Sequence, residues 1–342
     1  MADQVEMSYP DGPIPIHGRL NHLRLPGFDG ASIAKHECGE TLIDFVFVSV
    51  LLDAGAGAAW RFFDDDAGVT SRSEGLAVAS LRAAEAGVFS STSTPWKIDG
   101  AGLANLDQER VADLMQHRRG NQLAGIAGRL SLLRSLGKIV ERSGAVSVSA
   151  MLTAEFDSRG QLSATNLLAW ILNRFSDLWP GRLELDGNNL GDTWSHHAAG
   201  GEGGTAGLVP FHKLSQWLTY SLVEPLAASG VDVTDLEGLT GLAEYRNGGM
   251  LLETGAISLK TDPPSAALSP DDTLVVEWRA LTVSLLDEIV LRLQSFLPES
   301  RSGIGLGELL EAGTWPLGRR LAFDRSASGE PPIRIVSDGT VF

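Results

Sequence analysis

Three consecutive side chains capable of acid–base and electrostatic chemistry, Glu244, Tyr245 and Arg246, interrupt the apolar stretch "LTGLAEYRNGGMLLETG" at residues 239–255. A buried charge is costly unless it is paired, and an internal Glu–Arg ion pair is one explanation. However, neighbours on a helix project about 100° apart, so each side chain more easily finds a partner of its own. The cluster therefore favours the lining of a pocket for a polar ligand.

A second polar group falls in "PFHKLSQWLTY", where Lys213, Gln216 and Tyr220 share one helix face, as do Lys213, Trp217 and Tyr220. His212 stands just before them. A cation, an amide, a phenol and an indole on one face form either an amphipathic boundary or a pocket wall that stacks on a ligand and hydrogen-bonds to it. Both explanations fit this segment.

A third group of polar residues lies at the two ends of the segment from residue 53 to residue 74. Asp53 closes the apolar run "VFVSVLLD", where its charge opposes the helix dipole. This placement indicates a functional Asp or one paired with a cation such as Arg72. Ser73 is the expected N-cap of the next helix, with Glu74 in its first turn. The start of that helix is alternatively a seat for an anion.

The histidines are the only candidates for a metal site. His17 and His22 stand in "HGRLNH", and His196 and His197 are adjacent in a glycine-rich segment. None of these spacings is typical of a zinc site. Structural or surface roles are favoured for the first pair and a solvated loop for the second, so no metal ligands are assigned.

The composition excludes several classes of protein. The chain has 43 Asp and Glu against 27 Lys and Arg, a formal net charge of -16, which argues against nucleic-acid binding. The single cysteine, Cys38, fits a reducing compartment. The first residues do not read as a signal peptide, and the apolar run at 45–52 is too short to span a membrane. We predict a cytoplasmic protein without membrane contact.

Hydrophobic periodicity and helix-start signals predict a mainly α fold with few short strands. Pro225 is expected to kink or end its helix, and Asp271-Asp272 to begin the last one. The expected helices cover residues 72–87, 106–118, 125–142, 163–178, 211–228 and 271–297.

Strands are expected only at residues 146–152 and 333–336. Residues 1–40 are predicted to be an irregular N-terminal extension, and residues 41–342 a single helical catalytic domain. Residues 186–207 form the longest expected loop, and long loops are often functional, so we expect a lid there.

Six long stretches of the chain can be compared with known families: "SVLLDAGAGAAW", "RSEGLAVAS", "NQLAGIAGRLSLLRSLG", "LGDTW", "PFHKLSQWLTYSLVEPL" and "LTGLAEYRNGGMLLETG". Together they closely resemble the uracil-catabolism protein family of fungi and bacteria, which belongs to the ribosylurea (URC) route. The resemblance covers roughly residues 45–325. That family usually carries a longer helical segment before this region.

More distantly, "PFHKLSQ" and "AEYRNGG" resemble two motifs of the queuosine-5'-phosphate nucleosidase family, and the helix at 72–80 has a counterpart there. Those enzymes have a helical fold related to DNA glycosylases and hydrolyse an N-ribosidic bond. The resemblance therefore implies a multi-helix domain of the DNA-glycosylase-like kind. The acid in that family's motif is Asp, whereas this chain has Glu244.

The ribosylurea route opens the uracil ring, passes through ribosylurea phosphate and releases urea. The two resemblances together imply an N-ribosyl hydrolase that cleaves the bond between ribose and urea. Such cleavage passes through an oxocarbenium-like transition state that a carboxylate stabilises. Glu244 is the first candidate for this role, and Asp53 and Glu74 are the alternates. Glu74 or His212 would protonate the departing nitrogen.

The implied ligand is a small phosphorylated ribosyl compound, and association with other uracil-catabolism enzymes is also expected. No cofactor is expected, because "LAGIAG" is too rich in Ala for a dinucleotide loop. The remaining candidates for substrate binding are cations for the phosphate and aromatic walls of the pocket: Lys213, Arg246, Arg129, Arg72, Trp217 and Tyr245.

Two other functions fit the same residues. A metal-dependent amidohydrolase or ring-opening enzyme of the same route would need the four histidines to converge. A non-catalytic metabolite-binding partner would bind tightly without turnover and expose large apolar patches.

Overall fold

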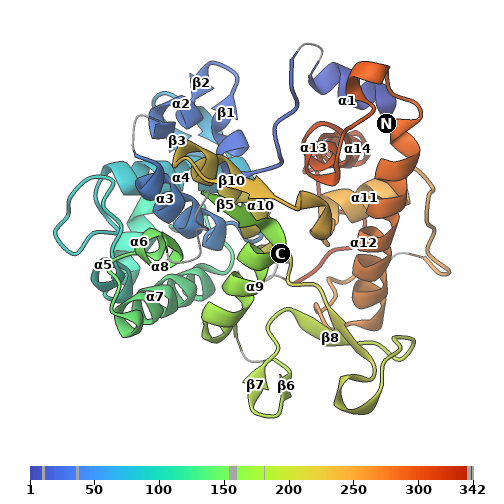
Figure 1. Ribbon diagram of the computed structural model, residues 1–342. Helices are drawn as coiled ribbons and strands as arrows, with labels where there is room; N and C mark the ends of the chain where they lie inside the picture. Colours follow the sequence, from blue (N-terminus) through green and yellow to red (C-terminus); the bar gives the residue numbers. More distant parts are fainter. Residues whose placement is uncertain are drawn as a thin grey trace. The chain divides into compact units, whose positions relative to one another are not determined.

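The computed structural model of the chain describes residues 1–9, 12–35, 38–153, 160–180, 182–262, 264–336 and 340. Within these residues helices dominate, and every strand has two or three residues (Figure 1). The predicted mainly α class is confirmed, and the likeness to DNA-glycosylase-like proteins stays a prediction. None of the helices in this part of the chain is long and apolar enough to cross a bilayer.

The chain divides into two compact units, each assembled from separate segments. Unit 1 contains residues 1–17, 181–216 and 237–336, and unit 2 contains residues 18–180, 217–236 and 337–342. The division falls within helix α10 (Lys213–Ala228). The predicted single domain over residues 41–342 stays a prediction.

Unit 2 is a helical assembly in which α3 packs against α4, α7 and α8, and α5 packs against α7. Its strands form two antiparallel hairpins, β1–β2 and β3–β4, and the parallel pair β5–β10. Its elements are η1 (Arg19–Leu23), β1 (Arg24–Leu25), β2 (Phe28–Asp29), α2 (Gly30–Lys35), α3 (Gly39–Leu51), β3 (Phe62–Asp64), β4 (Gly68–Thr70), α4 (Arg72–Glu85), α5 (Gly100–Ala104), α6 (Gln108–Leu114), α7 (Ile126–Ser143), α8 (Val148–Leu152), β5 (Gln161–Ser163), α9 (Ala164–Arg174), η3 (Ser176–Leu178) and β10 (Asp232–Thr234).

Helix α3 is the buried centre of unit 2. Every residue from Leu42 to Leu51 is buried, because the helix is apolar on nearly all sides. Its buried Asp44 accepts hydrogen bonds from the backbone N–H (2.7 Å) and hydroxyl (2.8 Å) of Ser149, at the start of α8. Burial raises the pKa of Asp44 to about 6, and these hydrogen bonds oppose the rise.

The predicted strand at residues 146–152 is wrong, because this segment contains helix α8. The hydroxyl of Ser147 accepts the backbone N–H of Ala150 and begins the helix. A local cap and the contact with α3 thus outweigh the β propensity of the valines.

Unit 1 is built around the long helix α12, with α11 packed against both α12 and α14 (Figure 1). Its strands form the antiparallel hairpins β6–β7 and β8–β9. Its elements are α1 (Ala2–Ser8), β6 (Glu184–Leu185), β7 (Asn188–Asn189), β8 (Thr193–Ser195), η4 (Gly203–Thr205), β9 (Leu208–Pro210), α11 (Tyr245–Glu253), α12 (Thr273–Gln294), η6 (Glu299–Arg301), α13 (Leu306–Leu309), the π-helix η7 (Leu310–Thr314) and α14 (Trp315–Arg325), while η5 (Leu236–Gly238) lies at the division between the units.

The sequence predicted an irregular N-terminal segment, but part of this segment is helical. Residues 2–8 form α1, whose Val5 is fully buried against Leu309 and Ala312. This apolar contact orders a segment that has no strong helix signal of its own.

The other expected elements are found with changed bounds. Asp272 caps α12 by accepting the N–H of Leu274, close to its predicted start. The helix with Pro225 continues to Ala228. Residues 333–336 form no strand, and Ile335 makes only an isolated parallel bridge with Leu268.

The long segment at 186–207 is not a plain loop. It holds β7, β8 and the short helix η4. A lid role for it stays a prediction.

Asp44 should make the stability of the protein depend on pH. Its pKa is about 6 in the folded chain against an ordinary 3.8. Unfolding therefore releases its proton between these values, and the free energy of unfolding falls as pH rises from about 4 to about 6, by about 2–3 kcal/mol. Urea unfolding of wild type and Asp44→Asn across this range checks the effect. The variant should lack this contribution, and parallel curves for the two proteins would contradict it.

The crossing of α11 and α14 depends on Gly318. A Cβ atom there would meet the carbonyl oxygen of Arg246 at 2.1 Å, which is backbone and cannot move aside. Gly318→Ala should lower the free energy of unfolding by about 2–3 kcal/mol. Gly303→Ala is the control, because a Cβ atom at that position meets nothing within 4 Å. Equal effects in chemical denaturation would show that the crossing is not tight.

Candidate functional site

Glu244, the first candidate for a catalytic carboxylate, is the N-cap of α11. Its two carboxylate oxygens accept the backbone N–H groups of Arg246 (2.7 Å) and Asn247 (2.6 Å). The side chain is buried, with 8% of its surface exposed. Each carboxylate oxygen has two lone pairs, so each retains one after accepting these bonds. Glu244 thus begins the helix and keeps acceptor capacity for another partner.

The side chains of Tyr245 and Arg246, which follow Glu244, have contacts apart from its carboxylate. The Arg246 guanidinium lies 4.9 Å from the centre of the Tyr245 ring, a cation–π arrangement, and donates to the carbonyl of Gly329 (3.2 Å). Tyr245 and Arg246 therefore contact each other, while the Glu244 carboxylate accepts backbone N–H groups. The phosphate-binding role of Arg246 stays a prediction.

A buried carboxylate absent from the predicted site, Asp192, lies at the start of α10. Its oxygens accept both terminal nitrogens of Arg279 (2.8 Å each), the indole N–H of Trp194 (2.7 Å) and the backbone N–H of Lys213 (2.9 Å). Burial pushes the pKa of Asp192 upward, but the charge of Arg279 and these hydrogen bonds outweigh it and hold the pKa below its ordinary value. Asp192 is therefore a stable anion.

Arg279 connects this carboxylate with the start of α11. Its side chain is almost fully buried, and its Nε donates to the carbonyl of Ala243 (3.2 Å), the residue before Glu244. The guanidinium lies 4.1 Å from the centre of the Phe211 ring. One side chain of α12 thus contacts both segments that carry predicted site residues.

Lys213 and Glu244 lie close enough for their charges to interact. Burial raises the pKa of Glu244, while its two N–H bonds and the charges of Lys213 and Arg246 oppose the rise. Lys213 is itself buried at the first position of α10. The structure therefore brings two predicted site residues, one acid and one cation, into a single cluster.

His212 adjoins this cluster. Its pKa is lowered, first by burial and further by the charge of Arg279, against the opposing charge of Asp192. Its backbone has a positive φ of 46°, which non-glycine residues seldom adopt. At neutral pH the imidazole is neutral, with one nitrogen able to donate and the other to accept.

The sequence contained signals for the two missed residues. Arg279 is a lone cation in the middle of "TLVVEWRALTV", a segment that must be largely buried as a helix. Asp192 lies in "LGDTW", which was used only as part of the family resemblance. Neither position reveals its partner, because the two residues are 87 positions apart.

In unit 2, Asp53 forms a buried ion pair with Arg19, at 3.0 Å. Ser73 donates its hydroxyl to the Asp53 carboxylate (2.7 Å) and accepts from Arg19 (3.1 Å). Arg19 also donates to the hydroxyl of Ser49 (2.8 Å). Arg19 is therefore a cation partner of Asp53, and the pairing of Asp53 with Arg72 stays a prediction.

Helix α4 begins at residue 72 as predicted, but its N-cap differs by two residues from the prediction. The N-cap is Ser71 rather than Ser73, and Arg72 is the first helical residue, with a positive φ of 55°. Glu74 is buried in the first turn. Unit 2 thus brings Asp53, Arg72 and Glu74 to the segment around the start of α4, although their predicted roles stay predictions.

Trp217 and Arg129 have identifiable contacts in unit 2. The Trp217 ring centre lies 5.3 Å from that of His22. Arg129 is fully buried and donates to the carbonyls of Leu52 (2.9 Å) and Ala54 (2.7 Å) after α3. These bonds satisfy carbonyls at a helix end, which is a structural role.

The histidines have separate partners. His17 pairs with Glu311 (2.6 Å), and His22 lies 2.7 Å from the Ser73 hydroxyl. The rings of His196 and His197 stack on each other, 4.5 Å apart. In the described ranges no three His, Cys, Asp or Glu side chains are placed to hold a metal ion.

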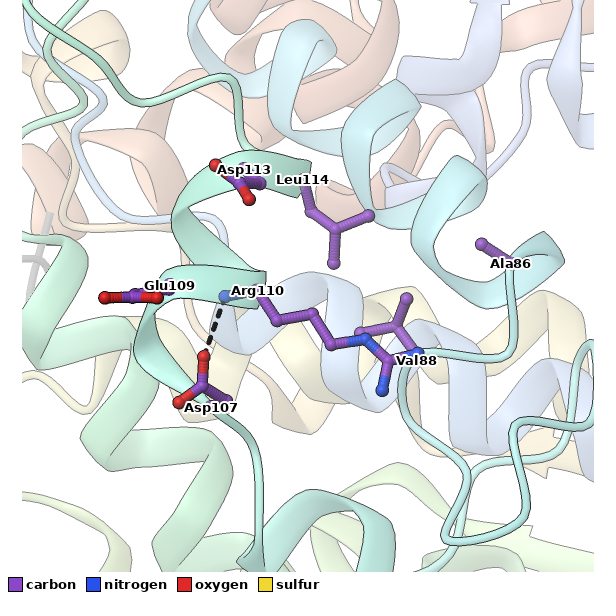
Figure 2. A pocket seen from close by; sticks show the side chains of 7 residues that line it. All are labelled: Ala86, Val88, Asp107, Glu109, Arg110, Asp113 and Leu114. Atoms are coloured by element: carbon purple, nitrogen blue, oxygen red, sulfur yellow. Dashed lines mark hydrogen bonds between the residues drawn. The ribbon is translucent and has the colours of Figure 1, made fainter.

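A surface cavity of about 610 Å³ lies elsewhere in unit 2, next to α6 (Figure 2). Arg110 extends along it, and the Arg110 backbone N–H donates to Asp107 (3.0 Å). None of the predicted site residues is among its lining residues, which are Ala86, Val88, Asp107, Glu109, Arg110, Asp113 and Leu114.

The free energy of unfolding should depend strongly on the buried Arg19–Asp53 pair of unit 2. Asp53→Asn removes the carboxylate that neutralises Arg19 and should lower the free energy of unfolding by about 3–5 kcal/mol. Asp66→Asn is the matched control, because the Asp66 side chain is 69% exposed in its ion pair with Arg82, and it should cost less than about 1 kcal/mol. A small effect for both variants in urea unfolding would show that Asp53 is not retained for stability.

Comparison with known proteins supports the resemblance. The chain matches over residues 1–342 a family described as "Protein of unknown function (DUF1688)". It is 38% identical over 349 residues to Protein urg3 of Schizosaccharomyces pombe, covering 96% of this chain and 84% of that protein. It is 33% identical over 377 residues to Uracil catabolism protein 4 of Lachancea kluyveri, covering 96% and 85%. The chain therefore belongs to the DUF1688 family, and the predicted kinship with uracil-catabolism proteins is confirmed.

Proposed function

We propose that this protein acts in uracil catabolism as an N-ribosyl hydrolase that releases urea from ribosylurea 5'-phosphate. A relative named as a uracil catabolism protein supports the pathway. The likeness of two motifs to nucleosidases that cleave an N-ribosidic bond supports the reaction. A cytoplasmic location and association with other enzymes of the route belong to the same proposal.

The observation that carries the proposal is the state of Glu244. Burial makes its ionised form unfavourable, although two N–H bonds and the charge of Lys213 support it. A positive charge that develops beside such a carboxylate is stabilised more strongly than one beside a solvated carboxylate. The gain arises in the transition state and not in the neutral substrate, which is the requirement for catalysis.

The proposed reaction breaks the bond between C1' and the urea nitrogen. The bonding electron pair leaves with nitrogen, which takes a proton, and C1' becomes an oxocarbenium ion next to Glu244. A water oxygen then bonds to C1' and loses a proton, giving ribose 5-phosphate and urea. In this proposal Glu244 stabilises the cation and orients the water.

The neighbours of Glu244 supply the remaining roles. Lys213 carries a buried positive charge suited to a phosphate or a ribose oxygen. His212 is a candidate proton donor for the departing nitrogen, and because its pKa is lowered it must first take up a proton. Glu74, the alternative donor from the sequence, belongs to unit 2 and is given no part in this step.

Asp53 is a weaker candidate for the catalytic acid. Its carboxylate already neutralises Arg19 and accepts the Ser73 hydroxyl. The Glu244 carboxylate accepts the backbone N–H groups of Arg246 and Asn247 and lies within reach of the charge of Lys213. We therefore assign the chemistry to Glu244 and a structural role to Asp53.

Purified protein should release urea and ribose 5-phosphate from ribosylurea 5'-phosphate, and Glu244→Gln should lower kcat about a hundredfold or more. The control is Asp272→Asn, because Asp272 caps α12 as Glu244 caps α11, through a bond of 2.9 Å to the N–H of Leu274. That variant loses a helix cap and should keep its activity.

The other outcomes are informative. If the compound raises Tm without urea release, the protein binds the compound and the proposed reaction is wrong. If it neither binds nor reacts, the pathway itself is wrong. If Glu244→Gln and Asp272→Asn lose equal activity, Glu244 acts only as a helix cap.

A further inference from the structure

We propose that Asp192 and Arg279 are positioning residues that together fix the separation between the Glu244 carboxylate and the Lys213 ammonium. The inference rests on the proposed function for its catalytic readout. The connection that Asp192 and Arg279 make between the starts of α10 and α11 is formed by contacts within unit 1. It can be tested without measuring turnover.

Asp192 fastens the start of α10 through three consecutive backbone groups. Its carbonyl accepts the N–H of Phe211 (2.9 Å) and of His212 (3.3 Å). Its side chain accepts the N–H of Lys213 (2.9 Å). The position of Asp192 therefore sets where the Lys213 side chain leaves the backbone.

Arg279 fastens the start of α11 on the other side. Its Nε donates to the carbonyl of Ala243, and its neighbour Trp278 donates its indole N–H to the carbonyl of Gly248 (3.0 Å). Two successive residues of α12 thus hold backbone on both sides of Glu244. A shift of Arg279 would move the carboxylate with its helix.

The bidentate bond between the two residues joins these anchors. Both terminal nitrogens of Arg279 donate to the two oxygens of Asp192 at 2.8 Å. A planar guanidinium held at two points resists rotation, and the Phe211 ring 4.1 Å away limits motion out of the plane. Lysine could keep the charge, but it could not make all three directed bonds.

The central test is Arg279→Lys, with Arg82→Lys as the matched control. Arg82 forms a comparable two-point pair with Asp64 (2.7 and 3.0 Å) in unit 2, and the proposed reaction gives neither residue a role. Arg279→Lys should lower kcat about 10–100-fold while KM stays within about threefold, since misplacement by about 1 Å affects the transition state most. Arg82→Lys should leave both constants unchanged.

A second readout does not require activity. The pKa of Glu244, followed by carboxyl carbon NMR and assigned by its loss in Glu244→Gln, should rise in Arg279→Lys, because the supporting charge of Lys213 moves away. A purely structural role of Arg279 would lower Tm without moving this pKa. Asp192→Glu, which keeps the charge but displaces it by one methylene, should act in the same direction if Arg279→Lys fails to fold.

The outcomes separate the two proposals. Hydrolysis by wild type with an unchanged kcat and an unchanged Glu244 pKa in Arg279→Lys would overturn the positioning role and leave the proposed function standing. If wild type releases no urea, the proposed function fails. The titration then decides alone: a raised Glu244 pKa supports the positioning role, and an unchanged one overturns it.

Discussion

The bidentate ion pair between Asp192 and Arg279 is the constraint on which the candidate site depends. Removing two charges from water costs several kcal/mol per ion, and the attraction between them only approximately offsets this cost. Apolar residues would fill the same space at no loss of stability. The pair contributes orientation rather than stability. Arg279 donates to Asp192 and to the carbonyl of Ala243, and Asp192 accepts the N–H of Lys213. These three hydrogen bonds hold β8, the start of α10 and the start of α11 in one arrangement.

The same use of charge recurs in unit 2. Arg19 and Asp53 are joined where η1, the end of α3 and the start of α4 meet, and Arg129 satisfies the carbonyls that follow α3. The Arg129 guanidinium thus replaces the water that would otherwise solvate the end of α3, and Arg19 joins three segments through its ion pair and hydrogen bonds. These arginines explain how an acidic chain with few regular strands holds its helices in place.

The sequence predicted what is decided locally. Helices α4, α7 and α12 have apolar periodicity and start signals within their own residues, and the Glu244 cluster was conspicuous because charge interrupted an apolar run. It could not predict partners that come from distant segments. The Asp192–Arg279 pair and the Arg19–Asp53 pair are decided by tertiary packing. Helix α8 was missed because Val146 and Val148 favour a strand, while the cap of the helix and its contact with α3 decide otherwise.

The position of Glu244 at the N-cap of α11 couples chemistry to helix stability. The N–H groups of Arg246 and Asn247 donate to the same carboxylate that is proposed to face the reacting carbon. Any gain or loss of charge on that carboxylate must change the strength of both bonds. The two backbone amide protons are therefore built-in reporters, whose resonances and exchange rates register the ionisation of the site without any label in it.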